Sequence, residues 1–120
     1  YISQRVQFGR SIASFQAVKH RCAALVVDIA EARALTYGAA VGLDAGSAEA
    51  GLEIIAAGML ATESLFRAAQ EAIQLHGGAG NSWEYDPHLY LRRAQASAAL
   101  FGTAEERLGI VARSLLGAAA

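Results

Sequence analysis

The stretch SFQAVKHRCAALVVDIAEARALTYGAAVGLD, residues 14–44, decides the fold of this chain. Apolar side chains recur in it at steps of three and four, and the charged side chains fall between them. This spacing predicts an amphipathic helix about 45 Å long, at a rise of 1.5 Å per residue. We expect its apolar face to be formed by Phe15, Val18, Cys22, Leu25, Ile29 and Ala32.

A second long helix is predicted directly after the first. The cluster Asp44-Ala45-Gly46-Ser47 provides both a stop for the first helix and an N-cap for the second. Apolar positions then alternate in steps of three and four, which is typical of antiparallel bundle packing. We expect this helix to end at Gly77-Gly78. Its predicted buried face consists of Leu52, Ile55, Met59, Thr62, Phe66, Ala69 and Ile73.

Two shorter helices are predicted near the C-terminus. Asp86 followed by Pro87 is a favourable helix start, and Thr103 with Glu106 forms a T-x-x-E capping box. In the last helix we expect three apolar side chains to point inward, and we expect the alanine tail to fray. The three side chains are Leu108, Val111 and Leu115.

The fold class predicted from these patterns is all-α, an antiparallel four-helix bundle in a single domain spanning residues 1–120. No segment keeps a period-two alternation, so no strand is predicted. Residues 1–7 are expected to form a short helical stub before the first long helix.

The composition points to burial in a larger assembly. Of the 120 residues, 54% are hydrophobic, and the mean hydropathy is +0.28, which is high for a small monomer. Because much of this excess is alanine, a tightly packed monomer is the alternative. The net charge of −1 disfavours nucleic acid and anionic membrane surfaces as partners.

The single cysteine, Cys22, excludes an intrachain disulfide and favours a reducing, cytoplasmic compartment. The spacing of His20, His76 and His88 does not predict a metal site. No apolar run reaches the ~20 residues of a membrane span. Because residues 1–5 contain neither an initiator methionine nor a signal-peptide core, we expect the chain to be the C-terminal part of a longer protein.

Two segments carry residues that a plain bundle does not need. Arg5-Val6-Gln7-Phe8-Gly9 brings a cation, an amide and an aromatic ring before a glycine. Gln74-Leu75-His76-Gly77-Gly78-Ala79-Gly80 ends a helix in a glycine cluster, which is either a helix cap or a place where backbone approaches a ligand. The spacing is not that of a dinucleotide-binding fingerprint, and no strand precedes it.

The residues of the first segment have two possible roles, one in ligand binding and one in the fold alone. Arg5 is either a solvated charge or a partner for a pyrophosphate, and Phe8 is either a core plug or a platform for a flat heterocycle. Phe15-Gln16 opens the first long helix, where free N–H groups favour an anion.

Taken with Phe101-Gly102-Thr103, these segments resemble the C-terminal helical domain of the flavin-dependent acyl-CoA dehydrogenases, along essentially the whole chain. The resemblance implies a four-helix bundle that contacts FAD across a dimer interface, within a dimer of dimers. It further implies that the first group of residues contacts FAD of a neighbouring subunit, that a second contacts FAD of its own subunit, and that Gly102 contacts the substrate. The first group is Arg5, Val6, Gln7, Phe8, Phe15, Gln16, Gln74, Leu75, His76, Gly77 and Gly78; the second is Thr103, Ala104 and Glu105.

The implied chemistry is α,β-dehydrogenation of an acyl-CoA thioester, with electrons passing from FAD to an electron-transfer flavoprotein. The family usually has a glutamate base just before the Gly-Thr pair, and Phe101 occupies that place. The sequence therefore predicts no catalytic residue within this chain.

Three hypotheses remain open. The base lies upstream of Tyr1, or the chain belongs to a non-catalytic subunit that forms a heterotetramer with a related dehydrogenase subunit. The second pattern is known for steroid side-chain breakdown, and residues 83–93 with Leu100-Phe101-Gly102 look closest to that branch. The third hypothesis is a flavin monooxygenase or oxidase of the same fold, or a plain helical assembly module.

Overall fold

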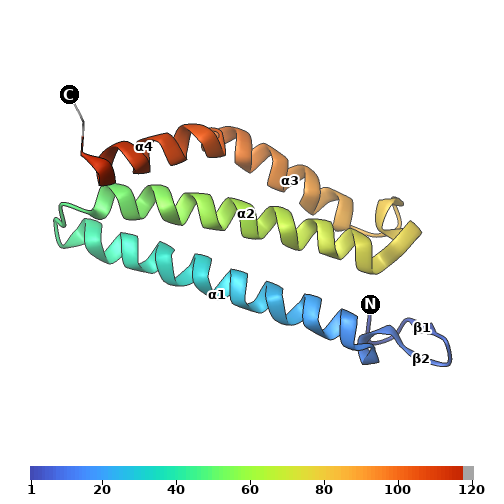
Figure 1. Ribbon diagram of the computed structural model, residues 1–120. Coiled ribbons are helices and arrows are strands. Elements are labelled where there is room, and N and C mark those ends of the chain that lie inside the picture. Colours follow the sequence, from blue (N-terminus) through green and yellow to red (C-terminus); the bar gives the residue numbers. More distant parts are fainter. Residues whose placement is uncertain (118–120) are drawn as a thin grey trace.

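A computed structural model describes residues 1–117 as an elongated helical molecule measuring 62 × 26 × 24 Å. Helices α1 (Gln16–Asp44) and α2 (Ala50–His76) run antiparallel along its length. Helices α3 (Pro87–Leu100) and α4 (Ala104–Leu116) follow one another along the other side of α2 (Figure 1). Thus α2 is the central element, and the predicted all-α class is confirmed.

The N-terminal segment departs from the prediction. Residues 1–7 do not form a helical stub, and the expectation of no strands was wrong: β1 (Val6–Gln7) and β2 (Arg10–Ser11) form a small antiparallel hairpin. The two turn residues, Phe8 and Gly9, have φ values of 54° and 76°, as a tight two-residue hairpin turn requires. Strands of two residues are too short to produce a detectable alternation in the sequence.

Two short 3₁₀ segments complete the structure. The first, η1 (Ile12–Ser14), leads from the hairpin into α1. The second, η2 (Gly77–Asn81), follows α2 directly, because Gly77 at φ 63° and ψ −140° stops the helix where the sequence predicted. The predicted N-cap of α2 was displaced, since Glu49 occupies that position and Ser47 Oγ accepts a hydrogen bond from its N–H at 3.2 Å.

The starts of the two short helices differ in how they are capped. Asp86 stands at the N-cap of α3 and Pro87 at its first position, but the Asp86 backbone is itself helical and its side chain makes no cap bond. At α4 the predicted capping box is confirmed. Thr103 Oγ1 accepts from Glu106 N at 3.1 Å, and Glu106 Oε2 accepts from Thr103 N at 2.8 Å.

The capping box at α4 gives a pH-dependent prediction. The backbone N–H of Thr103, and then its hydroxyl, hydrogen-bond Glu106 and hold the pKa of that carboxyl below its usual 4.5. This contribution to stability is present above about pH 4.5 and disappears as the pH falls through the lowered pKa. Glu106→Gln, which removes the carboxylate but keeps the size of the side chain, is expected to lower the urea-unfolding midpoint at pH 7 and to have much less effect at pH 2. An equal cost at both pH values would contradict this assignment.

The core is built from small side chains. Apart from Pro87, the buried apolar side chains among residues 1–117 are all alanine, and none of the larger ones is fully buried. The expected inward face of α4 was wrong, because Leu108 is 55% and Leu115 is 72% exposed. Instead Arg107 faces α2 and is buried. The predicted fraying of the alanine tail falls on residues 118–120, outside the described part of the chain.

Candidate functional site

The two segments singled out in the sequence lie at the same end of the molecule, and Tyr1 links this end of the chain to the C-terminus of α2. The Tyr1 ring stacks on the His76 imidazole with centroids 4.0 Å apart, and the Tyr1 hydroxyl donates to the His76 carbonyl at 3.3 Å. The hairpin that carries Arg5 to Phe8 therefore lies at the same end as the C-terminus of α2 (Figure 1). We call this region, residues 1–16 with 74–80, the hairpin end.

Phe8 is the most exposed large side chain of the hairpin end. It is 92% exposed and adopts a left-handed backbone, which is rare for a bulky residue and costs energy. Its ring meets Phe15 edge-on at 6.2 Å. The core-plug interpretation of Phe8 was therefore wrong for this chain, and the ring is presented outward.

Arg10 is a residue that the sequence reasoning missed. Its guanidinium lies 4.1 Å from the centroid of Phe15, a cation–π contact. It is brought there by pairing with Gln7 across the hairpin, so only recognition of the hairpin would have indicated it. Its positive charge therefore lies beside the Phe15 ring, and exposed Arg5, which precedes the first strand of the hairpin, forms no ion pair within residues 1–117.

The start of α1 adds unsatisfied donors to the same region. Phe15 is the N-cap and its side chain cannot accept a hydrogen bond, and no acidic residue stands in the first turn. The N–H groups of exposed Gln16 and the residue after it have no hydrogen-bond acceptor within residues 1–117, and the helix dipole favours an anion there.

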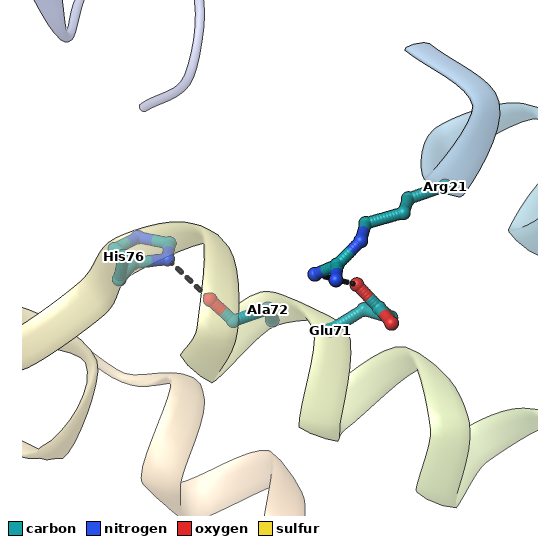
Figure 2. Close-up of polar contacts among 4 residues, drawn as sticks. All are labelled: Arg21, Glu71, Ala72 and His76. Carbon is teal, nitrogen blue, oxygen red and sulfur yellow. Dashed lines mark hydrogen bonds and ion pairs between the residues drawn. The ribbon is translucent and has the colours of Figure 1, made fainter. Parts of the chain in front are cut away.

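On the α2 side, His76 is held in one tautomer. Its Nδ1 lies 2.7 Å from the Ala72 carbonyl (Figure 2), and because a carbonyl can only accept, Nδ1 carries the proton. In the neutral ring Nε2 is then an acceptor. One turn earlier Arg21 of α1 pairs with Glu71 at 3.2 Å and joins the two long helices (Figure 2).

Gln74, Gly77 and Gly78 are exposed, and Leu75 is half-buried. A Cβ built on Gly78 would meet no atom within 4 Å, and the φ of Gly78 is not in the left-handed region. Nothing within residues 1–117 requires glycine at that position. The backbone here is thus open to something outside the chain.

The remaining predicted residues lie elsewhere, at the junction between α3 and α4. Phe101 is 62% exposed, Gly102 has φ 80°, and Thr103, Ala104 and Glu105 are exposed. The junction lies against Thr62, about 21 Å along α2 from His76 at 1.5 Å per residue. The structure therefore divides the predicted site residues between two places.

The description "Acyl-CoA dehydrogenase, C-terminal domain" belongs to the family model that residues 1–116 match. The chain belongs to the acyl-CoA dehydrogenase family and corresponds to its C-terminal domain. Among the described residues, none of the helices combines the length and the apolar character needed to cross a membrane.

Individual relatives agree with this assignment. The chain is 48% identical over 108 residues to the acyl-CoA dehydrogenase IpdE2 of Mycobacterium tuberculosis, covering 90% of this chain and 32% of that protein. It superposes on butyryl-CoA dehydrogenase from Megasphaera elsdenii with a TM-score of 0.90 at 32% identity, covering 98% and 30% of the two chains. A chain of the ChsE4–ChsE5 complex from Mycobacterium tuberculosis gives 0.87 at 31% identity, with 97% and 31% covered. The chain spans about a third of the length of these relatives.

Proposed function

We propose that this chain is the C-terminal part of an FAD-dependent acyl-CoA dehydrogenase, and that it contributes flavin contacts and the core of an oligomer. The observation that carries the proposal is the hairpin end, because an outward aromatic ring, two arginines, helix N–H groups and open glycine backbone lie at the same end of the molecule. These groups fit a dinucleotide that combines flat rings with a pyrophosphate. We assign this end to FAD of a neighbouring subunit.

The α3–α4 junction is the second proposed contact. We assign Thr103 to Glu105 to contacts with FAD of the same subunit, and Gly102 to a contact with the substrate. Bound FAD would supply the acceptor for the β-hydride, and an electron-transferring flavoprotein would take the electrons onward. The chain's own residues would bind and orient the flavin and the thioester.

The position just before the Gly-Thr pair, where the family usually carries its glutamate base, holds Phe101 in this chain. Phe101 cannot accept a proton, and Glu106 is held by the Thr103 cap. The base is therefore proposed to lie outside this chain segment, upstream in the same protein or on a related subunit. The likeness to a chain of the ChsE4–ChsE5 complex supports the heteromeric alternative, in which this chain is the subunit without a base.

The decisive experiment uses the intact parent protein, expressed alone and together with any adjacent related subunit. We would measure FAD per subunit and acyl-CoA-dependent dye reduction, with oxygen consumption to detect an oxidase or monooxygenase. Full FAD occupancy with turnover alone would identify a self-sufficient dehydrogenase; half occupancy with activity only on co-expression would identify the subunit without a base. Absence of flavin in both preparations would refute the proposal.

Gly78 provides a specific test of the flavin contact. Gly78→Ala in the intact protein is expected to weaken FAD binding about tenfold, or about 1.4 kcal/mol, by keeping the ligand from the backbone. Stability of the apoprotein should not fall, because the added Cβ meets no atom of residues 1–117 within 4 Å. The matched control is Gly51→Ala, at an exposed glycine near the start of α2. This variant should bind FAD with unchanged affinity and should gain about 0.5–1 kcal/mol of stability.

A further inference from the structure

Arg107 is a buried cation without a counter-ion among residues 1–117. It is 9% exposed, in the first turns of α4. Its Nε lies 3.4 Å from the Thr103 carbonyl and its Nη1 lies 3.5 Å from Thr62 Oγ1, both long for hydrogen bonds. The ion pairs within the described residues are Arg21–Glu71 and Arg67–Asp28, so neither includes Arg107.

The nearby acidic side chains do not neutralise it. Glu106 directs its carboxylate to the backbone N–H and hydroxyl of Thr103. Glu63 and Glu106 are both exposed, where water screens their charge, whereas Arg107 is buried. A guanidinium taken out of water without a partner is costly, and in proteins such groups are paired.

Arg107 lines a cavity of about 680 Å³ between α2, the end of α3 and the start of α4. The walls are mostly apolar, with Met59 and Phe66 from α2 and Ala98 and Gly102 from the α3 side. Both the volume and a largely apolar lining with few polar groups are typical of small-molecule sites. Arg107 contributes the buried positive charge of this cavity, and the exposed side chains of Glu63 and Glu106 also line it.

We propose that Arg107 binds a carboxylate carried by the acyl group of the substrate, which makes the preferred substrates acyl-CoA thioesters of dicarboxylic acids. This inference rests on the proposed dehydrogenase function, because Gly102 and the α3–α4 junction border the same cavity. The two long contacts to Thr103 and Thr62 involve Nε and Nη1. Nη2 has no acceptor within residues 1–117 and is available for a charge-assisted contact with a carboxylate.

A small molecule explains the site better than a carboxylate from another protein segment. The cation lies between α2 and α4, is itself buried, and borders an open groove of ligand size. It also lies within two turns of the segment proposed to contact the thioester substrate, so one acyl chain can reach both. A protein carboxylate at this site would give a different result in the binding experiment.

The test compares two thioesters of matched chain length on the intact, FAD-loaded protein, together with any subunit that its FAD loading requires. Octanoyl-CoA and the mono-CoA thioester of octanedioic acid are titrated against the flavin absorbance to obtain Kd values. Wild type is expected to bind the octanedioic ester at least tenfold more tightly. Arg107→Gln should abolish this preference while leaving the Kd of octanoyl-CoA within threefold. Arg113→Gln, an exposed arginine of the same helix, should retain the preference.

Equal affinity for both esters in wild type, or no binding of the octanedioic ester, would overturn the inference. The inference would also be overturned if Arg107→Gln lost the same affinity for both esters and had a lower Tm. That result would mean that the counter-ion of Arg107 is a carboxylate of the protein and not of the substrate. FAD content is measured first, because absence of flavin would refute the proposed function. If the protein contains flavin and binds octanoyl-CoA but does not prefer the octanedioic ester, only this inference is refuted.

Discussion

Replacing Phe8 with asparagine in the intact protein is expected to weaken FAD binding at least tenfold while leaving the fold as stable as before or more stable. Phe8 occupies a turn position with φ 54°, where asparagine is preferred and a bulky residue is strained. Removing the strain should return about 1 kcal/mol. Removing the ring, which is 92% exposed and so packs little within the chain, should cost only the ligand contact.

The measurement pairs FAD titration of the apoprotein with its urea unfolding curve. Tyr90→Asn is the matched control, since this exposed aromatic lies on α3, outside both proposed flavin contacts, and should leave the FAD affinity unchanged. A Phe8→Asn protein that binds FAD normally would show that the ring has no role in the cofactor site. A marked fall in stability would instead show that the hairpin depends on Phe8.

Gly80→Ala is expected to have the largest effect on the fold. Gly80 is buried in η2, and an added Cβ would lie 2.6 Å from the Ile73 carbonyl oxygen and 2.9 Å from its Cα. Because both contacts are with helix backbone, the η2 segment must shift away from α2. We expect a loss of about 2 kcal/mol, as for other overpacked sites.

Gly78→Ala, two residues earlier, is the control for this effect, because its Cβ meets open space. The two variants should separate function from stability: Gly80→Ala lowers the urea midpoint, and Gly78→Ala lowers FAD affinity alone. Unchanged stability in Gly80→Ala would mean that η2 does not pack against α2 as described.

The helical part of the structure could be predicted because its signals are local. The end of α2 at Gly77 and the Thr103–Glu106 capping box follow from residue types at fixed spacing, and both were predicted. The hairpin could not be predicted in this way. Phe8-Gly9 is not a typical turn pair, and each strand has only two residues.

The orientation of α4 was missed for a different reason. Its apolar pattern shows that Leu108 and Leu115 form one face, but a pattern does not indicate which element will cover that face. Within residues 1–117 α4 packs against α2 through the side that carries Arg107. Burial of an arginine there depends on Thr62, which is 45 residues away in sequence, and such a long-range contact leaves no local signature.

An alanine core changes which mutations this domain can tolerate. Truncating a large buried side chain normally opens a cavity that costs several kcal/mol, but the buried apolar side chains of residues 1–117, apart from Pro87, are already alanine. Truncating these side chains further can therefore remove very few atoms. Enlarging one of them is different: Ala94 is 0% exposed, so an added methyl group there would overpack the core. Within this chain, mutations that enlarge a core residue should be more harmful than those that shorten one. We therefore expect the small core residues to stay small among relatives, and the large exposed apolar residues to differ according to the surface that packs on them.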